Sequence, residues 1–384
     1  MFSSNRPQNL PYWRLSGFYF LFFITVGIFL PYWSLYLKAI GFDARQIGIL
    51  SAILVFSKVF ISYFWGWIVD YTGHRIRIIR LTSLFSVICF SAALYIQSFT
   101  GLAIILFLFS LFWSASLPQI EAATLTYLGD SSYAYTIIRV WGSISFIITV
   151  WLLGIAFEYI SITNVPLLIL VSVVVVWIMS LFVPDQDSGR FKHEQTSLLL
   201  ILSSPSVLAL LAVCFLMLAG HGPYYTFYSI YLEDNGYSST FIGKMWALGV
   251  IAEVLLFMIM QHLVALFSLR KLLISSLLLA CLRWFLIGFY IDNILLLVIA
   301  QLFHAATFGV YHAVAIQYIH RYFRGRLQGR GQALYSSVSF GAGMAIGSLA
   351  SGYAWDKWGP AECFAGAAIS ALAATVIAFV WIKD

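Results

Sequence analysis

Long apolar stretches recur along this chain, each about as long as the hydrocarbon core of a bilayer is thick. A helix needs about 20 apolar residues to cross that core, and twelve such stretches follow one another in the sequence. Charged residues make up only 9% of the chain, whereas soluble domains carry roughly 25%. The sequence therefore predicts an all-α membrane protein with twelve transmembrane helices. The stretches are 15–37, 46–68, 78–97, 101–124, 135–157, 165–183, 206–230, 241–263, 270–290, 293–316, 331–353 and 361–382.

Residues 33–48 are repeated, 195 positions later, as residues 228–243. Ser34, Tyr36, Leu37, Gly41, Ile47 and Gly48 fall on Ser229, Tyr231, Leu232, Gly236, Ile242 and Gly243. A parallel repeat in a membrane chain predicts two pseudo-symmetric bundles with a substrate path between them. A polar connection bounded by Pro184 and Pro205 reads as the linker between them. We expect an N-terminal six-helix bundle over 1–183, a cytoplasmic linker over 184–205 and a C-terminal six-helix bundle over 206–384.

Lysine and arginine are distributed unevenly over the loops. With the N-terminus placed in the cytoplasm, fourteen of the 21 lie on the cytoplasmic side, four lie outside and three lie within the apolar stretches. Such an excess is typical of cytoplasmic loops, so both termini are predicted to be cytoplasmic. The net charge of +6 is then a signal of topology, and no nucleic-acid partner is expected.

A glycine-rich polar loop, G-W-I-V-D-Y-T-G-H-R-I-R, runs from Gly66 to Arg77. Gly66 would permit close contact between helices, and Gly73 would permit a turn with positive φ. Asp70 would pair with a cytoplasmic arginine or face a helix N-terminus, forming a latch that one conformation breaks. The loop resembles the motif G-x-x-x-D-[RK]-x-G-[RK]-[RK] of the major facilitator superfamily, from which Tyr71 and His74 depart. The residues that match this gating motif are Gly66, Asp70, Gly73 and Arg75.

Two charged residues lie near the middle of their apolar stretches. Lys58 and Glu253 are separated by the repeat offset of 195, so duplication has placed opposite charges at equivalent positions. A charge at this depth costs at least about 2–3 kcal/mol and is a functional candidate by default. Either the two form a structural ion pair, or they take part in switching.

Further polar residues are predicted within the helices. Glu121 and Arg139 flank a short turn and are expected to meet, and Arg283 lies well inside the ninth stretch. The tenth stretch carries Gln301, His304, Thr307 and His312 on roughly one helical face. Two histidines beside Gln and Thr favour a functional role, and no metal site is expected because no carboxylate completes a ligand set.

Several runs resemble the phenylpropionate permease family over the whole length of the chain. They are Q-L-F-H-A-A-T-F-G-V-Y-H-A-V-A-I-Q-Y-I (Gln301 to Ile319), H-G-P-Y-Y-T-F-Y-S-I-Y (His221 to Tyr231), G-V-I-A-E-V-L-L-F (Gly249 to Phe257) and R-V-W-G-S (Arg139 to Ser143). A more distant similarity reaches lactose permease, a sugar/proton symporter, whose charge pattern is matched by Glu121, Arg139, Glu253, Arg283 and His304. Thr307 stands where that pattern has its proton-carrying glutamate. The resemblance thus implies Glu253 as the proton site, with Glu121 or His304 behind it.

The sequence and the resemblance together predict a monomeric secondary transporter in a bacterial inner membrane, coupled to protons and without a cofactor. No Walker motif is present that would indicate ATP hydrolysis. The expected substrate is a small aromatic carboxylate such as 3-phenylpropionate, neutralised by Lys58, Arg139 and Arg283. Alternatives are a sugar or nucleoside symporter, an integral-membrane enzyme and a membrane receptor. The residues expected to line an apolar slot are Tyr32, Trp33, Tyr224, Tyr225, Tyr228, Trp246 and Gln301.

Overall fold

The computed structural model describes residues 10–129, 132–185, 202–324 and 327–383, and nearly all of them are helical. Twelve of the described helical segments are long and apolar enough to cross a membrane, which confirms the predicted fold class and its twelve crossings. The first seven α-helices and two short 3₁₀ turns are α1 (Tyr12–Ala39), α2 (Ala44–Phe56), α3 (Lys58–Thr72), α4 (Arg75–Ser91), η1 (Ala92–Leu94), α5 (Phe99–Leu128), α6 (Ser132–Ala156), η2 (Ile162–Asn164) and α7 (Val165–Phe182).

The remaining elements form the second half of the molecule. They are α9 (Pro205–Asp234), α10 (Ser239–Leu266), α11 (Leu269–Phe289), α12 (Ile294–Leu302), η3 (Ala305–Val310), α13 (Tyr311–Tyr322), α14 (Gln328–Ser336), η5 (Ser337–Gly343), α15 (Met344–Trp358) and α16 (Pro360–Trp381). Both η3 and η5 are π-helical. The tenth crossing is therefore α12–η3–α13, the eleventh is α14–η5–α15, and the second is α2–α3 with a break at Ser57.

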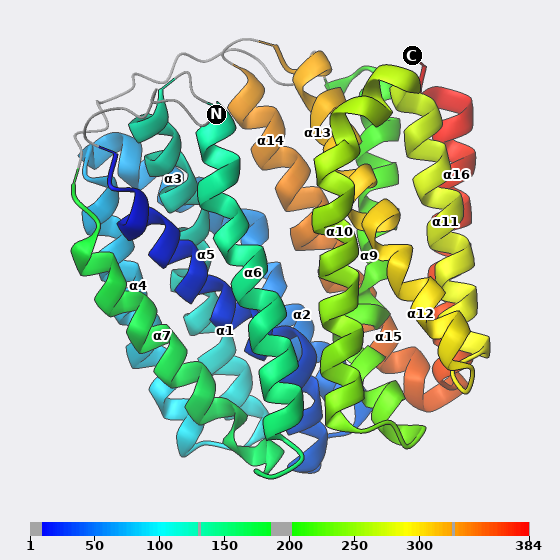
Figure 1. Cartoon of the computed structure of the whole chain (residues 1–384), viewed down its shortest axis with the longest axis horizontal. Coiled ribbons are helices and arrows are strands. Elements are labelled where there is room, and N and C mark those ends of the chain that lie inside the picture. Colours follow the sequence, from blue (N-terminus) through cyan, green and yellow to red (C-terminus); the bar gives the residue numbers. More distant parts are fainter. Residues whose placement is uncertain (1–9, 130–131, 186–201, 325–326, 384) are drawn as a thin grey trace, which may run out of the picture.

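The two halves lie side by side, with α1 to α7 in one bundle and α9 to α16 in the other (Figure 1). The first and last described residues are at the same end of the molecule (Figure 1). One large apolar core extends over both halves, and a smaller core lies within the first. The bundle boundaries remain a prediction, and residues 186–201 of the expected linker lie outside the described residues.

The repeated segment folds into the same turn twice. Gly41 and Gly236 both have positive φ, 95° and 80°, which a side chain would disfavour. Asp43 and Ser238, again 195 positions apart, then serve as the N-caps of α2 and α10 and accept hydrogen bonds from first-turn N–H groups. We call the end that carries these turns the outer end, following the charge distribution, and the opposite end the inner end.

Glycine contacts join the two halves at the outer end. A Cβ placed on Gly48 of α2 would lie 2.7 Å from the Cα of Gly352 of α15, and one on Gly154 of α6 would lie 3.2 Å from the Cα of Gly243 of α10. Small residues let membrane helices approach this closely. Gly66 of α3 behaves differently, because no atom lies within 4 Å of a Cβ placed there. In this conformation Gly66 makes no close helix contact with any residue that the structure describes, so the contact expected there remains a prediction for another conformation.

Candidate functional site

Glu253 lies on α10 and faces the π-helical segment of the tenth crossing. Its Oε2 lies 3.5 Å from His304 Nε2, and its Cγ would be 3.3 Å from a Cβ on Gly309. The absence of a side chain at Gly309 thus leaves room for the carboxylate. The alternative of a structural ion pair between Glu253 and Lys58 is wrong for this conformation. The basic group beside the Glu253 carboxylate is instead His304, a residue of the same half.

Lys58 is the first residue of α3, directly after the break at Ser57. Phe56 and Phe60 on either side of it are 47% and 63% exposed, as expected for side chains that face lipid. Two residues along a helix correspond to a rotation of about 200°, so Lys58 lies on the opposite face from both. Its side chain is exposed, and no ion pair ties it to any residue that the structure describes. Lys58 is thus an unneutralised cation on the interior face of its helix.

Arg283 of α11 is completely buried and is bonded to neutral groups. Its Nη1 donates to Thr307 Oγ1 at 3.2 Å, and its Nη2 donates to Gln301 Oε1 at 3.1 Å. The guanidinium also lies over the rings of Tyr224 and Trp284, 4.3 and 4.5 Å from their centroids, in cation–π geometry. Its Nε has no hydrogen-bond partner among the described residues. Arg283 is therefore a second cation without a carboxylate beside it.

The polar residues of the tenth crossing do not share one partner, although their spacing predicts a common face. Gln301 and Thr307 bind Arg283, His304 meets Glu253, and His312 Nδ1 lies 2.8 Å from Tyr335 Oη of α14. The π-helical η3 separates them, because a π turn holds an extra residue and rotates the following side chains relative to a regular helix.

The predicted pair in the first half is confirmed. Arg139 Nε of α6 lies 3.6 Å from Glu121 Oε1 of α5. The guanidinium also lies 4.2 Å from the ring centroid of Phe23 and 5.6 Å from that of Tyr19. Arg139 is therefore neutralised within its own half, unlike the other two deep cations.

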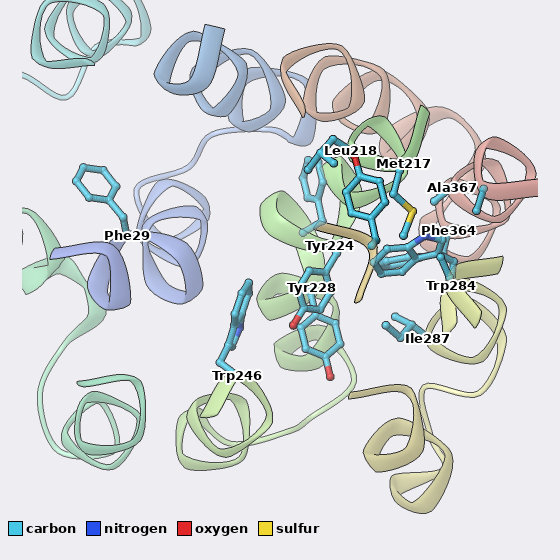
Figure 2. Close-up of a cluster of buried hydrophobic side chains, with 14 of the residues drawn as sticks. Phe29, Met217, Leu218, Tyr224, Tyr228, Trp246, Trp284, Ile287, Phe364 and Ala367 are labelled. Atoms are coloured by element: carbon cyan, nitrogen blue, oxygen red, sulfur yellow. The ribbon is translucent and has the colours of Figure 1, made fainter. Parts of the chain in front are cut away.

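The aromatic residues predicted for the slot separate into two groups. Tyr224, Tyr228 and Trp246 gather in the second half, whereas Phe29 of α1 stands apart from them (Figure 2). The ring of Trp246 lies 4.9 Å from Tyr224 and 6.0 Å from Tyr225. Gln301 Nε2 donates to Tyr224 Oη at 3.1 Å, which joins this aromatic cluster to the Arg283 network.

Tyr32 and Trp33 belong to the first half. Tyr32 Oη donates to the Val150 carbonyl at 2.5 Å and lies against Gly243 at the outer contact. Trp33 packs on Phe29 and Phe90, with ring centroids 5.4 and 5.9 Å away. Both are buried packing residues here, so the structure does not bring them into one slot with the second-half aromatics.

The loop between α3 and α4 has the turn that its sequence predicts. Gly73 ends α3 with φ 74°, and Arg75 begins α4. Asp70 and Arg75 interact electrostatically across this turn. The role of Asp70 as a latch remains a prediction.

Sequence reasoning missed two contacts. Tyr335 carries no signal beyond its aromatic type, and only the structure shows that it binds His312. Lys38 had a signal: it is 195 positions from Glu233, and its Nζ lies 2.7 Å from the Glu233 carboxylate and also contacts Asp234.

Comparison with known proteins identifies the family. Residues 12–365 match the model of the MFS_1 like family, which covers most of the chain and both bundles. The chain belongs to this family of major facilitator transporters. The expectation of a secondary transporter is thereby confirmed, and the alternatives of an integral-membrane enzyme and a receptor are wrong.

Relatives of this transporter span its length. It is 30% identical over 353 residues to the probable 3-phenylpropionic acid transporter of Escherichia coli (strain K12), covering 90% of this chain and 92% of the relative. It is 25% identical to the maltose permease of Geobacillus stearothermophilus, covering 89% and 87%. A crystal structure of a point variant of the nucleoside transporter NupG superposes with a TM-score of 0.85 at 15% identity, covering 97% and 98%. That last likeness shows the fold alone.

Proposed function

We propose that this transporter carries a small aromatic carboxylate, such as 3-phenylpropionate, into a bacterial cell through the inner membrane together with protons. The observation that carries the proposal is the surplus of positive charge at depth. Within the described helices, the deep cations Lys58, Arg139 and Arg283 outnumber the deep carboxylates Glu121 and Glu253, and Arg139 is already paired. A substrate carboxylate supplies a missing negative charge, and charge-assisted hydrogen bonds are the strong ones.

Two further observations support an aromatic acid. The cluster of Tyr224, Tyr225, Tyr228 and Trp246 offers ring faces against which an aromatic group packs. In addition, a relative that matches over nine-tenths of the chain is described as a probable 3-phenylpropionic acid transporter. Sugar symport is the second candidate, because the maltose permease also matches over most of its length.

Uptake into proteoliposomes with an acidic exterior tests the substrate. We expect labelled 3-phenylpropionate to accumulate, and maltose not to. Lys58→Gln removes a charged hydrogen-bond donor worth about 1.5–3 kcal/mol, so KM should rise roughly 10- to 100-fold. Lys244→Gln, at an exposed position of α10 near the outer end, is the matched control and should leave KM within a factor of two. Maltose uptake without phenylpropionate uptake would select the sugar symporter instead.

Proton coupling is assigned to Glu253. Its carboxylate lies beside His304 at a depth where a charge is costly, so proton and substrate occupancy are linked there. Glu253→Gln should retain counterflow, in which no net proton movement is needed, and lose accumulation driven by the pH gradient. Intact accumulation in this variant would remove Glu253 from the coupling role.

A further inference from the structure

Two histidines and a phenylalanine form a column of parallel rings along the tenth crossing. The His304 and Phe308 rings are 5.3 Å apart at 13°, and the Phe308 and His312 rings are 6.2 Å apart at 12°. Glu253 meets this column from α10. Its carboxylate lies 3.5 Å from His304, its Cγ packs on Gly309, and it interacts electrostatically with His312. The carboxylate therefore interacts with both imidazoles, at short distance with His304 and electrostatically with His312.

The two imidazoles differ in their surroundings. His304 is only 5% exposed, whereas His312 is partly exposed and nearer the inner end along its helix. A proton on His304 would add a second positive charge close to the Arg283 guanidinium, which acts on that ring electrostatically. His312 interacts electrostatically with the Glu253 carboxylate and, less strongly, with the Arg139 guanidinium of α6. Electrostatics therefore favour a proton on His312 over one on His304, and His312 is also the more exposed of the two side chains.

Tyr335 fixes the His312 ring. Its hydroxyl lies 2.8 Å from Nδ1, and its own side chain is completely buried on α14. A hydrogen bond at one ring nitrogen determines how the other is presented. When Nδ1–H donates to the Tyr335 hydroxyl, Nε2 of the neutral ring carries no proton and can accept one. Tyr335 also lies two residues before the π-helical η5, so the bond connects the proton route to the eleventh crossing.

We propose that His312 is the exit site for the coupled proton and that Tyr335 is its positioning residue. The proton on the Glu253 carboxyl passes to His312 Nε2 and from there to water at the inner end, which leaves Glu253 as a carboxylate. The proposal deepens the proton-coupled transport assigned above and rests on it. Tyr335 does not touch the substrate or the proton on Nε2; it acts by holding the imidazole.

The test compares two assays in proteoliposomes that contain the full chain and labelled 3-phenylpropionate. Tyr335→Phe keeps the ring and removes the hydroxyl, and His312→Gln keeps polarity and removes the titrating group. Each should lower gradient-driven accumulation by at least roughly tenfold, since misplacement of a reacting group has effects of this size. Counterflow should change by less than about threefold, because it does not require proton release. The control Tyr237→Phe removes a hydrogen bond of equal length, 2.8 Å to the Ile291 carbonyl at the outer end, and should affect neither assay.

The pattern of losses decides the proposal. An equal loss in both assays for Tyr335→Phe would make Tyr335 a packing residue and overturn its assigned role. Full accumulation by His312→Gln would overturn the exit site. If the wild-type protein transports no phenylpropionate under any gradient, the proposed function itself fails, and that outcome is recognised before any variant is compared.

Discussion

At the scale of single residues, Glu158 joins the two halves of the molecule. It lies just after α6, and its carboxylate accepts a hydrogen bond from the Thr240 N–H at 2.8 Å. Thr240 is in the first turn of α10, where N–H groups lack partners within the helix. A carboxylate is favourable at such a terminus. A residue of one half thus caps a helix of the other, and opening of the outer end must break this bond.

This contact predicts a pH dependence of the closed outer end. The Thr240 N–H holds the pKa of Glu158 below its ordinary value, which for glutamate is about 4.3. The contact therefore contributes its full stability above that ordinary value and loses it as the external pH falls through the lowered pKa. Spin-label distances across the outer end should lengthen in acid for the wild-type protein. Glu158→Gln should show a smaller lengthening in acid than the wild-type protein, and an unchanged acid response would contradict the prediction.

Thr307 shows how a single departure from a family pattern is resolved. The sequence places it where a proton-carrying glutamate is expected, and it cannot carry a proton. In the structure it accepts a hydrogen bond from Arg283, so a neutral oxygen replaces the carboxylate beside that arginine. The charge pattern singled out Thr307 from the sequence. That Thr307 bonds to Arg283 depends on a contact between two helices, which no spacing rule specifies.

At the scale of helices, the apolar stretches predicted the crossings and not their interruptions. The break at Ser57 and the π segments η3 and η5 leave the apolar pattern unchanged, because hydropathy determines how long a helix is and not how its backbone is bonded. These irregular segments meet one another: Ser337 Oγ of η5 donates to the Val59 carbonyl at 3.0 Å. The break beside Lys58 is thus stabilised by the other half, which could not be derived from either segment alone.

The glycine contacts between helices predict a shift of conformation on substitution. Gly48→Leu would force side-chain atoms into the α15 backbone at Gly352, and overpacking costs about 1–3 kcal/mol. Only the closed outer end contains this contact, so the substitution should favour outward opening. Labelling of a single cysteine placed below the contact, in a background without the native cysteines, should become faster from outside.

Gly366→Leu provides the control for that experiment. It lies on α16, and no atom is within 4 Å of a Cβ placed there. The labelling rate should stay at the wild-type level. Equal acceleration by both substitutions would indicate a general loss of packing and would contradict the role assigned to Gly48.

At the scale of the whole molecule, the repeat explains where the halves touch. Gly48 and Gly243 are equivalent positions in the two copies, and each packs on a glycine of the opposite half. The outer contact is therefore pseudo-symmetric, with α2 on α15 and α6 on α10. Lys38 and Glu233, also equivalent, meet directly, whereas Lys58 and Glu253 do not. Two equivalent positions contact each other only when both lie next to the axis that relates the halves. The sequence does not reveal how far a residue lies from that axis.

The ion pairs of Lys38 predict the effect of charge reversal. Its partners are partly exposed, so each pair contributes at most about 1 kcal/mol and is weakened by salt. Lys38→Glu would place three carboxylates together at the outer end and should lengthen spin-label distances there. A second substitution, Glu233→Lys, should restore the wild-type distances at low salt. Failure of the second substitution to restore them would show that the charges do not hold this end closed.

The pairing of Lys38 with Glu233 also bears on how such a chain arose. In an assembly of two identical half-length proteins, a position beside the two-fold axis faces its own copy. Two lysines there would repel, and so would two glutamates or aspartates. Opposite charges at this position require two copies that differ in sequence. The contact therefore dates from after the copies diverged, and it lets each half recognise its unlike partner rather than a second copy of itself.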